Sequence, residues 1–290
     1  MALTDEVKMT KKPSKMENNS NPFFIEGPAC INTSGGRTSA YMLRQIQLAG
    51  SMEDPSVIAV FADTGKEREE TYEFLKNITD HFGIPIHYVA YGYTPTMERR
   101  CFPKGETPFE LMIKKERYLP NPTQRICTDR MKIKHIHRYM KFVRLHKYYR
   151  KVIGLRADEK TRVANFRNAP DASRIYLPLN SAGADKQAVI ARRRSQPFDL
   201  QLKDWEGNCD LCFLKGMNKR KRIMRDRPDL AEWWIERERE MNHSFRAHSP
   251  SYEKLYQITK RQPELFDTSL SDEELEKGDI DDLNDCYCTF

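Results

Sequence analysis

Hydroxyl side chains and two glycines are concentrated near the N-terminal end of the chain, in the stretch Ser34-Gly35-Gly36-Arg37-Thr38-Ser39. Glycine lets a backbone turn tightly without a Cβ, so several N–H groups can converge on one anion. A helical pattern follows, and its unpaired N-terminal donors and dipole also favour an anion. Together with the hydroxyls and the arginine, this stretch has the chemistry of a phosphate-binding loop. The alternative is an ordinary Ser/Gly turn that caps a helix, because short glycine motifs also match by chance.

Polar residues also follow two other apolar runs. Asp63-Thr64-Gly65 comes directly after the run at 57–61, and Arg156 ends a second run at 151–156. Because the carboxyl ends of parallel strands lie at one edge of a sheet, we expect Asp63 and Thr64 to be neighbours of the glycine-rich stretch. Arg156 can neutralise a phosphate through a bidentate contact. The alternative for Asp63 is a helix N-cap, since a strongly helical stretch begins soon after it.

The elements that must position these groups alternate between strands and helices. The β-branched run at 57–61 is typical of a strand covered on both faces. The order strand, glycine turn, helix, strand, helix, strand predicts an α/β fold: a doubly wound, mostly parallel sheet with helices on both faces. The predicted strands lie at 25–33, 57–61, 84–91, 151–156 and 176–179. The predicted helices lie at 38–49, 67–81, 107–117, 132–147, 217–226 and 228–242, and 181–195 is predicted as a loop.

Composition divides the chain into four parts. Residues 1–21 are rich in Lys, Asn, Ser and Pro and are predicted to be a disordered arm. Residues 22–204 carry the predicted α/β domain, and 205–265 a helical extension that contains cysteines. Residues 266–290 hold nine acidic residues and one Lys and are predicted to be a flexible tail.

The overall composition is that of a globular protein with a very polar surface, since 39% of the 290 residues are hydrophobic and 31% are charged. This length can bury one substantial core. No apolar run approaches the roughly 18–20 residues that span a membrane, and the polar N-terminus has no signal-peptide core. We therefore expect a cytoplasmic protein without a membrane partner.

The positive charge is unevenly spread. The formal charge is +7, from 49 basic and 42 acidic residues, and residues 125–151 alone hold ten Lys or Arg and one acid. Arg192-Arg193-Arg194 is a second basic run. Such zones commonly meet the phosphates of a nucleotide or of DNA or tRNA. The alternative is a solvated helix face, which is at least as common.

Four separated stretches then agree with one family. The glycine-rich stretch resembles the pyrophosphate-binding loop of the ATP-pyrophosphatase, or adenine nucleotide alpha-hydrolase-like, superfamily. The run from Val60 to Glu67 resembles the second motif of phosphoadenylyl-sulfate (PAPS) reductases, and Cys127-Thr-Asp-Arg130-Met-Lys132 is similar to their cysteine and Arg/Lys segment. Gly154-Leu-Arg156-Ala-Asp158-Glu159 is similar to their Gly-x-Arg-x-x-Glu segment. The stretches fall in the family's order, and the resemblance covers roughly residues 25–240.

The resemblance implies a site for an adenine nucleotide, either ATP or a sulfonucleotide (PAPS or APS). It implies that Arg130, Lys132 and Arg156 contact the reacting phosphates. It also implies that the nucleotide is bound by Ser34, Gly35, Gly36, Arg37, Thr38, Ser39, Asp63, Thr64, Gly65 and Gly154. One departure concerns Thr38, where the family loop usually has Asp, and this weakens the case for Mg²⁺-dependent ATP hydrolysis more than the case for nucleotide binding.

The cysteines have several interpretations. Seven cysteines in a reducing compartment do not suggest a disulfide framework. The resemblance implies a [4Fe–4S] cluster on Cys101, Cys127, Cys209 and Cys212; zinc would use the same four thiolates, and unliganded core cysteines are the third interpretation. The resemblance also offers Cys286, in Cys286-x-Cys288, as a tail nucleophile, although the flanking acids would raise the pKa of its thiol; an incidental thiol pair is the alternative.

Three functions follow. The first is ATP-pyrophosphatase-type activation coupled to sulfur transfer, with a cysteine-desulfurase sulfur donor and DNA or tRNA as acceptor, as in tRNA thiolation and DNA phosphorothioation enzymes. The second is a PAPS or APS reductase that releases sulfite and is re-reduced by a thioredoxin-like partner. The third is a nucleotide- or nucleic-acid-binding protein without catalysis.

Overall fold

Five parallel strands form one sheet in the computed structural model of the chain, which describes residues 21–261 and 271–277. The strands are β1 (Ala29–Thr33), β2 (Val57–Asp63), β3 (Ile86–Ala90), β4 (Arg150–Ile153) and β5 (Ile175–Tyr176). Their order across the sheet is β3-β2-β1-β4-β5. The chain leaves β1 for β2 on one side and returns to β4 on the other, so the order reverses between β1 and β4. Ligands of such sheets bind outside the carboxyl ends of the strands at that reversal.

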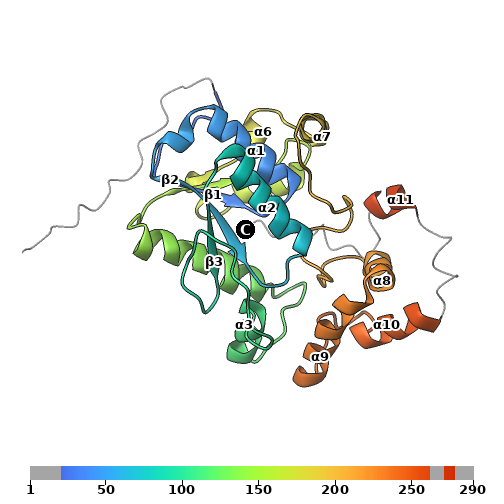
Figure 1. The fold of residues 1–290 in the computed structure, drawn as a ribbon. Coiled ribbons are helices and arrows are strands. Elements are labelled where there is room, and N and C mark those ends of the chain that lie inside the picture. Colours follow the sequence, from blue (N-terminus) through green and yellow to red (C-terminus); the bar gives the residue numbers. More distant parts are fainter. Residues whose placement is uncertain (1–20, 262–270, 278–290) are drawn as a thin grey trace, which may run out of the picture.

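Helices cover both faces of the sheet (Figure 1). On one face, α1 (Arg37–Leu48) and α2 (Glu69–Phe82) pack with apolar side chains of β1 and β2 such as Ile31 and Phe61. On the other face, the helical segment 127–143 packs Ile136 and Met140 against the alternate side chains of the same strands. Strands that are covered on both sides read as continuous apolar runs, which explains the run in β2. The predicted doubly wound α/β fold is confirmed.

The segment 127–143 contains a π-helical stretch (Cys127–Ile133), α4 (Lys134–Arg138) and a second π-helical stretch (Tyr139–Val143). The remaining helices are α3 (Pro108–Glu116), α5 (Lys160–Arg167), α6 (Pro178–Ser181), α7 (Lys186–Arg194), α8 (Met217–Asp226), α9 (Ala231–Met241), α10 (Tyr252–Arg261) and α11 (Asp272–Lys277). Short 3₁₀ turns lie at Ser51–Glu53, Ala172–Arg174 and Pro228–Leu230. Within the described residues, no helix is long and apolar enough to cross a membrane.

The predicted helical extension is present and has its own aromatic core. Side chains of α8, α9 and α10 gather around Trp234, which is fully buried and stacks on Tyr252 with a ring separation of 5.1 Å. Figure 1 shows α9 beside α3, which contributes Phe109 to the same core. The predicted domain boundaries stay predictions, and residues 1–20 and most of the acidic tail lie outside the described residues.

Two backbone hydrogen bonds join this extension to the carboxyl end of β2. The N–H of Asp210 donates to the carbonyl of Lys66 (2.9 Å), and the N–H of Arg68 donates to the carbonyl of Asn208 (2.8 Å). The side chains of Lys66 and Asp210 also form an ion pair of 2.7 Å, with 11% and 5% of each side chain exposed. Trp234 Nε1 donates to the same carboxylate (2.8 Å). The extension is therefore fixed beside the edge of the sheet where ligands bind.

Several predicted elements differ from the structure. The helix predicted at 132–147 is found at 127–143, and the strand predicted at 151–156 is β4 and ends at Ile153. Residues 181–195 were expected to be a loop, but α7 begins after Asp185, whose carboxylate caps the helix by accepting from the N–H of Ala188. The sequence does not predict this helix, because its basic composition gives little hydrophobic periodicity. The predicted strand at 176–179 is β5 and ends at Tyr176, because Pro178 begins α6.

We predict that Asp210→Ala lowers the free energy of unfolding by about 3–5 kcal/mol, because it leaves the buried Lys66 ammonium unpaired. Urea unfolding monitored by tryptophan fluorescence measures this change. Asp80→Ala is the matched control, since it breaks the exposed Lys76–Asp80 pair on α2 and should cost less than about 1 kcal/mol. Equal losses in the two variants would contradict the structural role of the Lys66–Asp210 pair.

Candidate functional site

The loop between β1 and α1 has the geometry of an anion cradle. Gly35 has a φ of +74°, and a Cβ there would lie 2.5 Å from Thr71 Cγ2 of α2, so this position requires glycine. Gly36 occupies the N-cap position of α1 in extended conformation and has no side chain that could accept from the first amides of the helix. These amides can therefore donate to a bound anion.

Three hydroxyls lie together behind this loop. Ser39, which is 2% exposed, donates to the carbonyl of Gly36 (2.8 Å). The hydroxyls of Thr33 and Ser34 each lie 3.3 Å from the Ser39 oxygen. The Ser39 hydroxyl thus fixes the turn from within, and Ser34 and Thr38 remain the more accessible hydroxyls of the loop.

The end of β4 completes the cradle from the other side of the sheet reversal. Gly154 packs against α1, since a Cβ there would lie 3.4 Å from the Met42 side chain and 3.8 Å from Ser39 Cα. The Arg156 guanidinium then lies beside the loop, with Nη1 donating to Thr38 Oγ1 (3.4 Å) and Nε to Asp158 (3.0 Å). The structure therefore brings Gly154, Arg156 and Thr38 together, as the sequence predicts.

A cavity of about 240 Å³ opens at this cradle. Gly36 and Thr38 of the loop line it, together with parts of α7 and of the segment 200–208. Its acidic lining residue is Asp204. Six basic side chains also line it: Arg37, Arg156, Lys186, Arg193, Lys203 and Lys219. A cavity with this excess of positive charge attracts a ligand that carries several negative charges.

Asn208 is a site residue that the sequence analysis missed. Its Nδ2 donates to the carbonyl of Ser34 (2.6 Å), and the same atom lies 3.3 Å from where a Gly36 Cβ would be. Asn208 therefore holds the loop from the side of the C-terminal extension. Its place next to Cys209 in the Trp205–Cys212 stretch is the one signal that could have pointed to it.

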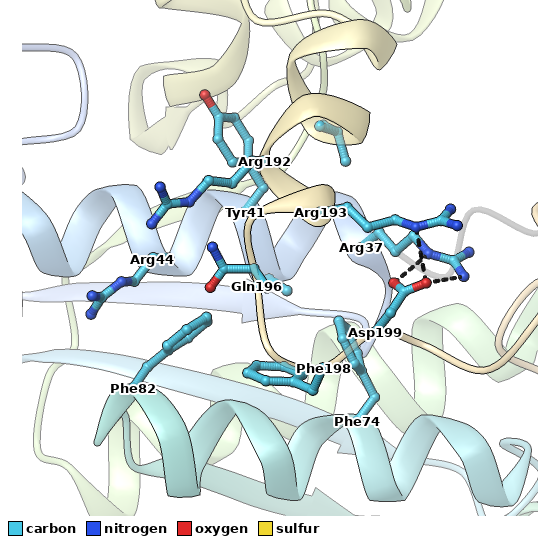
Figure 2. A pocket seen from close by; sticks show the side chains of 12 residues that line it. Arg37, Tyr41, Arg44, Phe74, Phe82, Arg192, Arg193, Gln196, Phe198 and Asp199 are labelled. Carbon is cyan, nitrogen blue, oxygen red and sulfur yellow. Dashed lines mark hydrogen bonds and ion pairs between the residues drawn. The ribbon is translucent and has the colours of Figure 1, made fainter.

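Arg37 points toward the wall of the cavity. It donates to both carboxylate oxygens of Asp199 (2.8 and 3.0 Å), to Asp204 (2.8 Å) and to the carbonyls of Leu200 and Leu202. Figure 2 shows Arg37 and Arg193 converging on Asp199, at the edge of a smaller apolar pocket between α1, α2 and α7. The predicted contact of Arg37 with a nucleotide stays a prediction.

The Asp63-Thr64-Gly65 turn lies at the end of β2 but does not line the cavity. Asp63 is 1% exposed and accepts from the Tyr72 hydroxyl (2.7 Å) and the N–H of Gly65 (2.9 Å), while its Oδ2 has no partner. Burial, with the nearby Glu67 carboxylate, raises the pKa of Asp63 to about 7. The alternative that Asp63 caps a helix is wrong, because Arg68 is the N-cap of α2.

The Arg/Lys segment lies on the π-helical stretch 127–133. Arg130 is paired with Glu116 (3.2 Å) and Asp129 (3.3 Å), and Lys132 is 5% exposed. Neither of them lines the cavity. Their predicted contacts with a reacting phosphate stay predictions.

The four cysteines predicted as ligands are not assembled. Cys209 and Cys212 are buried in the core of the extension, Cys127 packs against that core, and Cys101 is exposed. Among residues 21–261 and 271–277, no three His, Cys, Asp or Glu side chains are placed to hold a metal ion. These side chains do not fit a four-thiolate cluster or zinc site. Cys286 lies outside the described residues.

Two comparisons relate the chain to known proteins. The family model described as the phosphoadenosine phosphosulfate reductase domain matches residues 28–170, a range that holds β1, the glycine loop, Asp63 and Arg156. The chain is also 31% identical over 207 residues to the uncharacterized nin region protein ORF290 of Escherichia phage lambda. That match covers 65% of this chain and 67% of the phage protein.

The raised pKa of Asp63 predicts a pH dependence of stability. An unfolded Asp titrates near 3.8, so between about pH 4 and pH 7 the folded state holds a proton that the unfolded state has lost. The free energy of unfolding should therefore fall as pH rises through this range, by about 1.4 kcal/mol per unit of pKa difference. Asp63→Asn, which resembles the protonated acid, should remove this slope in urea unfolding at a series of pH values. An unchanged slope in the variant would contradict the assignment.

Proposed function

The chain belongs to the phosphoadenosine phosphosulfate reductase domain family of the adenine nucleotide alpha-hydrolase-like superfamily, and on that premise we propose that it is an enzyme acting on a sulfonucleotide. In this proposal the ligand is an adenine nucleotide of the PAPS or APS type. The observation that carries the proposal is the basic cavity at the reversal of the sheet, bounded by the glycine loop and Arg156. The fold and the family support nucleotide binding. The reaction on the bound nucleotide is what we propose.

Side chains of the cavity are suited to bind phosphate and sulfate groups. The amides of Gly36 to Ser39 would hold one phosphate at the N-terminus of α1. Arg156 would bind the same group through its planar fork. The lining holds six basic residues and one acid, a net of five positive charges. These charges can neutralise the phosphate and sulfate groups of a bound nucleotide.

The helix α11, which precedes Cys286 in the chain, is held beside the cavity. Asp272, at the start of α11, accepts from Trp205 Nε1 (3.0 Å) and pairs with Lys203 (3.1 Å), and both of these residues line the cavity. Leu275 of α11 is buried in the core of the extension. Cys286 follows the end of α11 by nine residues, a span of up to about 30 Å in extended chain. The proposal therefore needs the segment after α11 to bring this thiol to the cavity.

The proposed reaction starts with attack of the Cys286 thiolate on the sulfate sulfur of the nucleotide. A sulfur–sulfur bond forms, and the bond between sulfur and the bridging phosphate oxygen breaks, so the nucleotide leaves with its phosphate. A second thiol, from Cys288 or a thioredoxin-like partner, then attacks Cys286 Sγ, which releases sulfite and leaves a disulfide. The cavity cations would stabilise the negative charge that develops on the leaving phosphate.

A second candidate is ATP activation followed by sulfur transfer to nucleic acid. The basic run Arg192-Arg193-Arg194 is the last turn of α7, which lines the cavity, so a bound DNA or tRNA backbone would lie beside the nucleotide. By contrast, the basic residues 141–150 lie toward the amino end of β4, where Arg144 donates to the carbonyl of Pro55 ahead of β2. This separation divides the basic zone at 125–151 between the two edges of the sheet.

The first test is nucleotide binding. We predict that Arg156→Gln weakens binding of adenosine 3′,5′-bisphosphate at least about tenfold in titration calorimetry, because a charge-assisted bidentate contact is lost. Arg150→Gln is the matched control, since Arg150 lies at the opposite end of β4. This variant should bind the bisphosphate as tightly as the wild type does. Equal weakening by the two changes would contradict the placement of the site.

The second test is the product. With PAPS or APS and reduced thioredoxin, we expect sulfite release, and we expect Cys286→Ser to abolish it while nucleotide affinity stays unchanged. Sulfite and pyrophosphate are quantified in parallel. Pyrophosphate from ATP without sulfite from PAPS would support the second candidate, and binding without either product would identify a binding protein.

A further inference from the structure

Asp204 lies among cations on the wall of the basic cavity. Its Oδ1 is 2.8 Å from Arg37 Nη1 and 3.9 Å from Arg193 Nη1, and its Oδ2 is 3.8 Å from Lys186 Nζ. One carboxylate is therefore surrounded by three positive charges from α1 and α7. Three cations around one oxyanion is the arrangement that a protein offers to a phosphate or sulfate.

Two of the cations have anchors that do not depend on Asp204. Arg37 donates to both oxygens of Asp199 and to the carbonyl of Leu202 (2.8 Å). Arg193 Nε pairs with the same Asp199 at 2.9 Å. Figure 2 shows Arg37 and Arg193 directed at Asp199 from two helices. If Asp204 moved away, both guanidinium groups would stay in place.

The Asp204 side chain is partly exposed, although the buried Leu202 and Trp205 hold the backbone on either side of it. Residues 195–208 between α7 and the extension contain no helix or strand, and the Asp204 side chain is 27% exposed. A partly exposed carboxylate can leave its partners by a change of side-chain rotamer and be hydrated, while the backbone of the segment stays in place.

We propose that Arg37, Lys186 and Arg193 form a second anion subsite beside the glycine loop, which Asp204 fills until a phosphate or sulfate of the ligand displaces it. The subsite shares the cavity of the proposed function and deepens it. The ligand carries two separated anionic groups, one on the glycine loop with Arg156 and one on this subsite. The second group is either a further phosphate of the nucleotide or a backbone phosphate of a nucleic acid.

The test is the affinity of Asp204→Asn for anions. Removing the competing carboxylate should tighten binding of adenosine 3′,5′-bisphosphate about tenfold, since one charge-assisted contact no longer has to be displaced. The gain should be smaller for AMP, which has one phosphate. Asp199→Asn should weaken the bisphosphate, because it releases the two arginines, and Asp80→Asn on α2 is the control for the loss of one surface charge.

Inorganic pyrophosphate and a single-stranded oligonucleotide complete the set of probes. If Asp204→Asn binds the bisphosphate more tightly, the group that enters the subsite is a nucleotide phosphate. If only the oligonucleotide binds more tightly, that group is a backbone phosphate of a nucleic acid. A gain for pyrophosphate in a protein that binds no adenine nucleotide would support the subsite while refuting the proposed function. If Asp204→Asn binds every probe as the wild type does, or more weakly, the subsite is refuted.

If Asp204→Asn does not fold, Arg193→Gln provides a second test of the subsite. Arg193 is 41% exposed, so the change should not affect folding, which thermal unfolding verifies. It should weaken binding of the bisphosphate about tenfold and binding of AMP by a smaller factor. Equal effects on the two nucleotides would overturn the subsite.

Discussion

Mutual repulsion among six basic side chains is the constraint on which this structure depends. Arg37, Arg156 and four lysines or arginines from α7, the segment 200–208 and α8 line one cavity of about 240 Å³. At the short distances inside such a cavity, their repulsion must be offset by anions. The protein supplies some of these itself, through Asp199 and Asp204 opposite Arg37 and through Asp158 opposite Arg156. The remaining positive charge favours the binding of a polyanionic ligand in this cavity.

The rest of the molecule holds these charges in place against that repulsion. The reversal of strand order between β1 and β4 brings the glycine loop and Arg156 to one point. The C-terminal extension closes the other side, because Asn208 is fixed on the loop and Asp210 is fixed on Lys66. The loops at the edge of the sheet therefore line one side of the cavity. Residues as far apart in sequence as Ser34 and Asn208, which are separated by 174 positions, complete it.

The parts of this arrangement that sequence could predict are local. Tight turns need glycine and buried parallel strands need apolar runs, so the glycine loop, β2 and the position of Arg156 follow from short stretches. Asn208 and Asp204 could not be predicted in this way, since their roles depend on long-range packing. The helix α7 was missed for another reason: a helix that lines a charged cavity has few apolar residues with which to mark its period. The four-cysteine site shows the converse, because matching residue types did not ensure that the fold brings them together.

The central claim is that the phosphates of an adenine nucleotide bind at the reversal of the sheet. Hydrogen–deuterium exchange with and without saturating adenosine 3′,5′-bisphosphate tests it most directly, since it locates the amides that the ligand protects. We expect slower exchange in peptides covering 34–40 and 154–158, and no change at 141–148 near the opposite edge of the sheet. Unchanged exchange at 34–40, or protection confined to another part of the chain, would contradict it.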